Sequence, residues 1–366
     1  MIPALADERA RLVELEMQIL EAERALTALK LQESVVRERL NAYKYPVLNL
    51  PNEIITETFL NFVPEYPKCS PTAGPRSPMR LTHICRLWRE IALATPRLWR
   101  AMSLSLRSPF SLHNLWLDRA GSLPLAIHIR ELLSDYSESA PDIPELVPAL
   151  LPYLPRCEYL QCRHQMRLSD FPIVESELPF LRHLDLHLYE LPPRGIQLLD
   201  VPMLRSVVLD NCATDGIVLP WTQLTTLSMH DISLENCEDI LRQASNLLEC
   251  KLNLFADDED FFIDPPITLT HLNSFQVVSD LYITNVLDSF ILPALSRLQI
   301  VEGDLGDHPI STLTTFISRS GCKLQQLWIT YANLDTARSY VAAFPSIEEL
   351  NVLAGTVPNP KPFHLL

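Results

Sequence analysis

A short apolar frame recurs nine times in the chain, and it constrains the fold more than any other feature. From residue 154 onward the order is Leu, two variable residues, Leu, one variable residue, Leu, with other apolar residues substituting. A unit of this kind cannot bury its apolar side alone, so successive units must stack side by side. The fourth frame position recurs every 20 to 29 residues, at Leu160, Leu184, Val207, Leu227, Cys250, Phe275, Leu298, Leu327 and Leu350.

The prolines and the segments between frames indicate one strand and one helix in many of the units. Proline often stands two residues before the frame, where a strand can begin without losing a ladder hydrogen bond. Helical patterns are predicted between frames at 235–245, 283–290, 312–320 and 335–343. The period and frame are typical of leucine-rich repeats, which predicts an α/β horseshoe solenoid over residues 107–366. Its repeats should be irregular, because only Cys212 matches the family's Asn/Cys position.

A second pattern occupies residues 50–104. Leu50, Pro51 and Glu53 begin one predicted helix. A second predicted helix, at 79–94, carries Ile84, Cys85 and Trp88, and Pro96, Leu98 and Trp99 close the segment. The stretch resembles an F-box domain, a small all-α unit that we place at residues 45–106. The family pattern is interrupted by an insert at 65–78, whose prolines and glycine predict an exposed loop between the two helices.

The F-box resemblance implies a partner and a role. Such a domain docks a Skp-family adaptor and, through it, a cullin, within an SCF-type ubiquitin ligase. No catalytic residue or cofactor is expected in this chain, because the transfer chemistry lies on other subunits. By the matched positions, the adaptor surface is built or bordered by Leu50, Pro51, Ile54, Ile55, Phe59, Leu81, Ile84 and Trp88.

Residues 1–44 are predicted to form a long helix. The segment 4–42 has neither proline nor glycine, and its apolar residues follow alternating steps of three and four, as in a coiled coil. Leu15, Ile19, Leu26 and Leu29 share one seam. The helix either pairs with a second copy through residues 5–40, giving a homodimer, or packs along its own chain, or remains a solitary amphipathic helix.

Charge and composition exclude several classes of function. Residues 107–366 hold 33 acidic and 16 basic residues, which argues against binding nucleic acid through phosphates. No apolar stretch approaches the roughly 20 residues of a membrane-spanning helix, so no membrane partner is expected. The first residues lack the pattern of a secretory signal, and the eight cysteines form no zinc-type pair. These features predict a cytoplasmic or nuclear protein with reduced thiols.

The alternation of the strands predicts a substrate surface. Frame residues point inward, so the residues between them share the outward, concave face. On that face we expect His183, Asp185, His187, Arg297, Gln299, Gln326, Trp328 and Thr330. Trp328 is the largest apolar element among them. It either contacts the substrate or is covered by a neighbouring loop or by the tail at 358–366.

The sequence is therefore compatible with three functions. The first is a substrate-recognition subunit of an SCF-type ligase, with the repeats binding an unknown protein substrate. The second is an interaction scaffold with F-box and repeats but no role in ubiquitination. The third is a metal-dependent enzyme that uses His183, Asp185 and His187, although side chains two apart on a strand lie about 6.6 Å from each other.

Overall fold

The structure is a computed structural model that describes residues 2–42, 46–105, 110–130, 150–163, 177–187, 195–210, 216–255, 262–279, 283–333 and 337–355. The chain divides into two compact units, Met1–Thr58 and Phe59–Leu366. The boundary falls inside helix α2, Asn52–Phe62.

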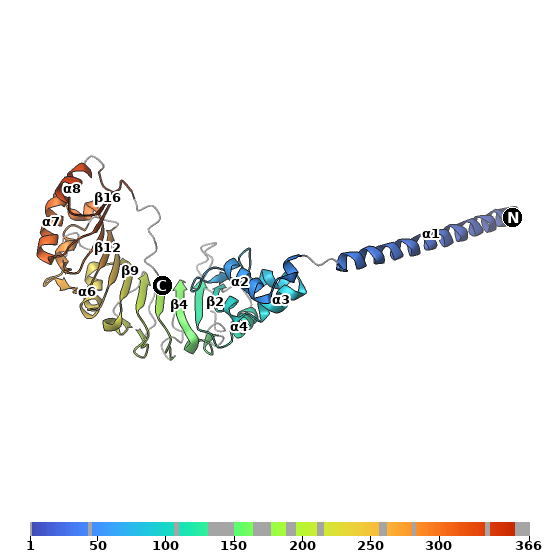
Figure 1. Cartoon of the computed structure of the whole chain (residues 1–366), viewed down its shortest axis with the longest axis horizontal. Coiled ribbons are helices and arrows are strands. Elements are labelled where there is room, and N and C mark those ends of the chain that lie inside the picture. The colour runs from blue at the N-terminus through green and yellow to red at the C-terminus, as the bar shows by residue number, and fades with distance from the viewer. Residues whose placement is uncertain are drawn as a thin grey trace. The chain divides into compact units, whose positions relative to one another are not determined.

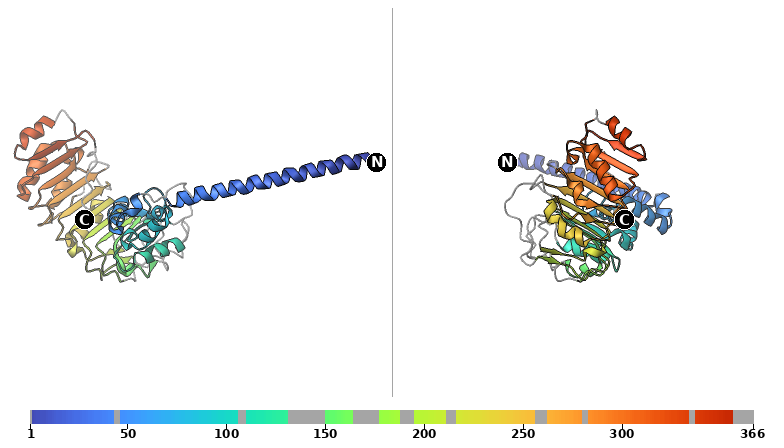
Figure 2. Two further views of the ribbon diagram at one scale, coloured as in Figure 1. Left: turned by 45° about the vertical axis from the view of Figure 1, so that its right-hand side comes forward. Right: turned by 90° about the vertical axis from the view of Figure 1, so that its left-hand side faces the viewer.

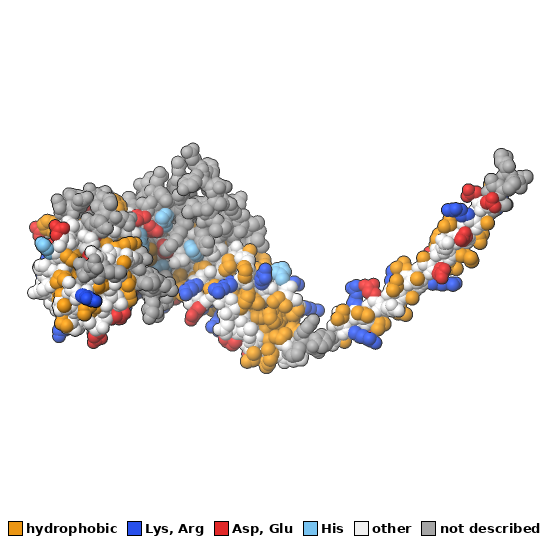
Figure 3. Space-filling model, turned by 90° about the horizontal axis from the view of Figure 1, so that it is seen from above, with side chains coloured by type: hydrophobic (Ala, Val, Ile, Leu, Met, Phe, Trp, Pro, Cys, Tyr) orange, Lys and Arg blue, Asp and Glu red, His pale blue; other side chains and the backbone are white. Residues whose placement is uncertain are grey.

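The first unit contains the predicted long helix, which is confirmed as α1, Ile2–Ala42. All side chains described along α1 are exposed, the apolar ones included. Figure 3 shows hydrophobic side chains between acidic and basic ones along its length. A 3-10 turn, η1 (Pro46–Asn49), precedes α2.

The second unit is built on a parallel sheet of twelve strands, which confirms the α/β class. The strands follow one another in chain order, as the colours show in Figures 1 and 2. They are β1 (Ser70–Pro71), β2 (Ala101–Ser105), β3 (Leu125–Arg130), β4 (Cys157–Arg163), β5 (His183–His187), β7 (Ser206–Asp210), β9 (Thr226–Ile232), β10 (Glu249–Leu254), β12 (Ser274–Ser279), β14 (Arg297–Val301), β15 (Gln326–Thr330) and β16 (Glu349–Val352).

The register of the sheet follows the repeat frame. The residue at the fourth frame position in each strand is paired with the same position in the next, from Leu160 in β4 to Leu350 in β16. These side chains are buried, apart from the half-buried Leu350 in the last strand. One continuous apolar row therefore runs beneath the sheet from β4 to β16, which is why the units stack.

Helices and short ladders cover the inward face. Figure 1 shows the sheet bending along its length with α6, α7 and α8 on the outer side of the bend. These helices span Leu234–Gln243, Pro309–Ser320 and Ala337–Ala343. Two small parallel ladders join β6 (Ile196–Gln197) to β8 (Ile217–Val218) and β11 (Ile267–Thr268) to β13 (Phe290–Ile291). Further turns of 3-10 helix in this part of the unit are η4 (Leu154–Arg156), η8 (Trp221–Gln223), η9 (Val286–Ser289) and η10 (Glu302–Leu305).

Two predicted helices are shorter than the sequence indicated. The helix predicted at 79–94 is split into η2 (Pro78–His83) and α3 (Arg86–Leu93). The break lies at Cys85, whose backbone is extended and whose sulfur accepts a hydrogen bond from the Trp88 N–H at 3.4 Å. The thiol thereby caps α3. The helix predicted at 283–290 is the single 3-10 turn η9.

The region expected to be an all-α F-box also contributes strands. Its β1 pairs with β2, so the sheet begins well before residue 107. After β2 the chain forms α4 (Phe110–Arg119), and η3 (Pro96–Leu98) precedes β2. Trp99, at the end of η3, is fully buried, and its ring meets that of Trp116 from α4 edge to face at 5.1 Å.

The sequence predicted the insert at 65–78 as an exposed loop, and the structure confirms this only in part, because some of its residues are exposed and others pack against the sheet. The guanidinium of Arg100 lies 3.3 Å from the centre of the Tyr66 ring. The Tyr66 hydroxyl donates to Glu158 at 2.7 Å. Ser70 is buried in β1, and Ser77 is buried where it caps η2. The prolines do exclude a helix here, but an aromatic anchor and an edge strand fix the segment all the same.

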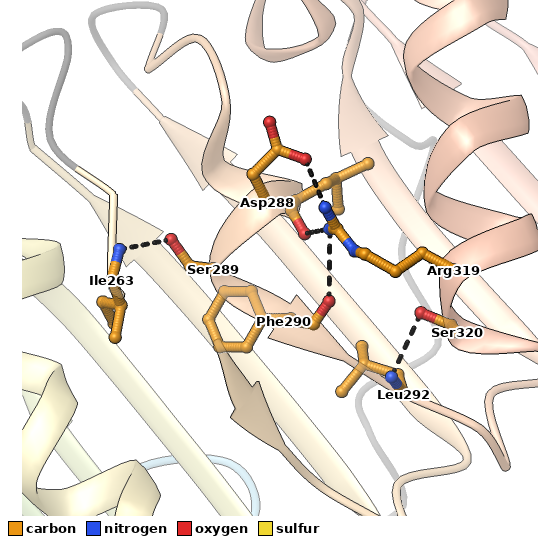
Figure 4. Close-up of polar contacts among 8 residues, drawn as sticks. Ile263, Asp288, Ser289, Phe290, Leu292, Arg319 and Ser320 are labelled. Atoms are coloured by element: carbon orange, nitrogen blue, oxygen red, sulfur yellow. Dashed lines mark hydrogen bonds and ion pairs between the residues drawn. The ribbon is translucent and has the colours of Figure 1, made fainter. Parts of the chain in front are cut away.

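Hydroxyl groups tie neighbouring repeats together on the helical side. The Ser289 hydroxyl accepts from the N–H of Ile263 at 2.9 Å, and the Ser320 hydroxyl accepts from the N–H of Leu292 at 3.2 Å (Figure 4). Both serines are buried. They satisfy backbone donors that would otherwise be buried without a partner.

Arg319, at the end of α7, makes a second tie of this kind. Its guanidinium pairs with Asp288 at 2.7 Å and donates to the carbonyl oxygens of Leu287 at 2.7 Å and Phe290 at 3.4 Å (Figure 4). Gln223 and Asn246 likewise donate to backbone carbonyls one repeat earlier. The sequence has no regularly repeated asparagine. Different side chains at different positions therefore make the hydrogen bonds that connect neighbouring repeats.

Candidate adaptor and substrate surfaces

The structure separates the predicted adaptor residues into exposed and buried sets. In the first unit, Leu50 and Ile54 are 42% and 52% exposed, and Pro51 is exposed as well. Ile55, one residue on, is buried, because neighbouring positions on α2 face different ways. In the second unit, Ile84 is 59% exposed at the break before α3. Each exposed side chain is a candidate for direct contact with a partner.

The remaining predicted adaptor residues are structural. Phe59 and Leu81 are buried, and Trp88 is half-buried. The rings of Phe59 and Trp88 meet edge to face at 4.9 Å. Within the second unit, this contact joins Phe59, at the end of α2, to Trp88 in α3.

Two residues predicted for substrate contact are buried, contrary to expectation. His183 and Asp185 in β5 are 2% and 1% exposed. His183 Nδ1 lies 2.9 Å from the Ser206 hydroxyl on β7. His187 is half-buried, and its Nδ1 lies 2.9 Å from a carboxylate oxygen of Asp210. The alternation along β5 predicted that His183, Asp185 and His187 share one outward face. The side chains of His183 and Asp185 are nevertheless covered.

The insert lies over this part of the face and leaves a cavity of about 420 Å³. The cavity is lined by Tyr66 and Cys69 from the insert and by Tyr159, Gln161 and His183 from the strands. The Tyr66 and Tyr159 rings meet edge to face at 5.5 Å. Burial raises the pKa of the Cys69 thiol to about 12, so this thiol is neutral and a poor nucleophile. Because the insert covers this part of the outward face, the accessible part of the face lies on later strands.

The later strands keep most of the predicted residues accessible. Arg297 and Gln299 on β14, and Gln326 and Trp328 on β15, are half-buried. Thr330 is the exception, because it is buried and its hydroxyl donates to the Ile300 carbonyl at 3.3 Å. Arg297 pairs with Glu249 at 2.9 Å, and Gln326 donates to Glu349 at 2.8 Å.

Three further residues of this face were missed by the sequence analysis. Lys251, Gln276 and Asn351 occupy the fifth frame position, directly after the inward fourth position, as Gln299 and Trp328 do. The sheet pairs all five in order across β10, β12, β14, β15 and β16. The sequence could have identified these three residues, because they occupy the same fifth frame position as Trp328.

The structure gives no support to a metal centre in its described part. Among the residues placed there, no group of three or more His, Cys, Asp or Glu could hold a metal ion. The seven cysteines in the described ranges are free thiols. No helix in those ranges is both long and apolar enough to cross a bilayer. Four consecutive acidic residues at 257–260 predict a solvated loop or a contact with a basic partner. They lie outside the described residues, as do Cys212 and the tail at 358–366.

Comparison with protein-family models and with curated proteins finds no match to the chain.

Proposed function

We propose that this chain is the substrate-recognition subunit of an SCF-type ubiquitin ligase, acting in the cytoplasm or nucleus. The observation that carries the proposal is the motif series of residues 50–99, in which the leading Leu50, Pro51 and Ile54 are exposed apolar side chains. Exposed apolar residues at the start of a helix are expected to contact a partner. The F-box resemblance identifies that partner as a Skp-family adaptor and, beyond it, a cullin.

The repeats would supply specificity. We interpret residues 107–366 as an irregular leucine-rich-repeat horseshoe, a proposal that the in-register row of frame residues supports. Its outward face from β10 to β16 is the proposed substrate surface. On this proposal the chain is not an enzyme and needs no cofactor, because the ubiquitin-transfer chemistry lies on other subunits of the ligase.

A scaffold function is the alternative. The same two surfaces could join an adaptor and a second protein without directing ubiquitination. The two functions differ in whether a cullin accompanies the adaptor, so cullin binding separates them.

Binding of the purified chain to a purified Skp-family adaptor tests the first step. The double variant Leu50→Ala and Pro51→Ala should bind at least about thirtyfold more weakly, the effect of losing about 2 kcal/mol at a hot spot. Leu199→Ala, which truncates another exposed leucine, is the matched control and should bind as wild type does. Equal affinity of a folded double variant and wild type would remove both residues from the interface.

A further inference from the structure

The fifth frame position forms a row of side chains on the outward face of the sheet. From β10 to β16 the row consists of Lys251, Gln276, Gln299, Trp328 and Asn351, each in direct register with the next. Within the described part of the chain, the side chains of Lys251, Gln276 and Gln299 make no hydrogen bond or ion pair. Lys251 and Gln299 are half-buried and therefore offer hydrogen-bonding groups that bind no other described residue, whereas Gln276 is buried.

Lys251 provides the row's one uncommitted charge. It is half-buried, and desolvation lowers the pKa of its ammonium group. Glu249, two residues earlier on the same face, is held by Arg297 at 2.9 Å. A carboxylate brought by a ligand would give this ammonium the ionic partner that the described residues do not supply.

The rest of the row suits an extended polypeptide. The carboxamide of the half-buried Gln299 can donate to a peptide carbonyl and accept from a peptide N–H, whereas Gln276 is only 6% exposed. Trp328 adds the row's aromatic surface, and tryptophan is enriched among binding hot spots. A backbone crossing the strands would meet first the Lys251 ammonium, then the Gln299 amide, then the indole ring.

The distance between Lys251 and Trp328 determines how far apart the two contacting residues of the ligand must lie. From β10 to β15 there are three strand steps of about 4.8 Å, so Lys251 and Trp328 lie about 14 Å apart along the row. An extended chain advances about 3.4 Å per residue and covers that distance in about four residues. Residues four apart project to the same side of an extended chain, so both can face the sheet at once.

Building on the proposed function, we propose that this row binds an extended segment of the substrate that places a carboxylate at Lys251 and an apolar side chain, about four residues away, at Trp328. The segment is thus defined by one acidic and one apolar residue in fixed spacing. Gln299, between the two, would form hydrogen bonds with the peptide backbone.

Binding of synthetic peptides to the full-length chain tests this inference. The probes are capped peptides of alternating Ser and Thr with one Asp and one Leu placed from two to six positions apart. Affinity should peak at a separation of about four, by about tenfold over the odd separations. One further probe lacks Asp and ends in a free carboxylate four positions after Leu, which distinguishes a terminal from a side-chain carboxylate. No binding by any probe, or affinity independent of separation, would overturn the inference.

Variants assign the two contacts. Lys251→Met should lower the affinity for the best peptide about tenfold and leave the affinity for its Asp→Asn counterpart unchanged. Trp328→Ala should abolish the preference for Leu over Ser. Lys323→Met, which alters an exposed lysine outside the row, is the matched control. If Lys251→Met and Lys323→Met behave alike in folded protein, the assignment of the carboxylate to Lys251 is wrong.

Adaptor binding of the same preparations separates this inference from the proposed function. A chain that binds the spaced peptides but no adaptor would refute the ligase proposal and leave the peptide site standing. A chain that binds the adaptor but none of the peptides would refute the peptide site and leave the ligase proposal standing.

Discussion

At the scale of single residues, Asp304 is a buried carboxylate with only one of its two oxygens hydrogen-bonded in the described structure. It lies in η10 and is 1% exposed. One oxygen accepts from the Ser279 hydroxyl and from the Ile283 N–H. The other is buried without a hydrogen-bond partner in the described structure. Burial raises the pKa of this carboxyl to about 6 from its ordinary 3.8.

This shift predicts a loss of stability as the pH rises. The folded state holds the proton more tightly than the unfolded state, so the free energy of unfolding falls between about pH 4 and pH 6. The shift of roughly two pKa units corresponds to about 3 kcal/mol. Asp304→Asn has no proton to lose, so wild type should lose up to that amount relative to the variant between pH 4 and pH 7. Urea unfolding at intervals across this range measures the difference.

The control for this experiment is Asp307→Asn, which alters an exposed carboxylate nearby. Its unfolding free energy should follow that of wild type across the same range. A constant difference between wild type and Asp304→Asn at every pH would show that Asp304 does not titrate there.

Single residues also show where reading the sequence succeeds and fails. Alternation predicted the inward residues correctly, because each strand must bury one side against the core. It failed for the outward His183, Asp185 and Thr330, because exposure also depends on what lies above the strand. For the β5 histidine, that cover includes an insert more than a hundred residues earlier in the chain, which no local pattern reveals.

At the scale of elements, α1 bears the clearest unpaired surface. The predicted seam of Leu15, Ile19, Leu26 and Leu29 is exposed throughout. Apolar side chains outside that seam, such as Met17 and Leu31, are exposed as well. A helix of this composition is stabilised by burying such residues against another helix. We propose that the occupant of the seam is a second copy of α1.

Light scattering of paired variants tests self-association. Ile19→Asp with Leu26→Asp places charges inside the seam and should convert a dimer to a monomer at tens of micromolar. Met17→Asp with Leu31→Asp makes the same chemical change outside the seam and should leave the dimer intact. A monomeric wild type, or equal dissociation of both variants, would contradict pairing through the predicted seam.

Other elements differ from prediction for local reasons. The apolar stripe of residues 79–94 fits one continuous helix, yet Cys85 adopts an extended backbone and starts a new one. Sequence periodicity does not register a single residue that caps a helix with its thiol. The insert is a similar case: its prolines exclude a helix, but the packing of Tyr66 against Arg100 and Tyr159 depends on distant strands.

At the scale of the whole molecule, the repeat is the part of the fold that the sequence predicted best. The frame fixed which residues point inward, and the sheet pairs them in the order of the chain. The beginning of the sheet was missed, because β1 and β2 lie in a stretch that carries another motif. The candidate surfaces follow the same division: their positions on strands and helices were predictable, and their accessibility was not.

Co-purification of a cullin with the full-length chain, from cells that express it, tests the central claim most directly. Adaptor and cullin should accompany the wild-type chain and the Leu199→Asp control. They should be lost at least about tenfold from the folded double variant Leu50→Asp and Ile54→Asp, because charges replace the exposed apolar side chains that lead the motif. Adaptor without cullin on the wild-type chain, or cullin retained equally by the double variant, would contradict the account.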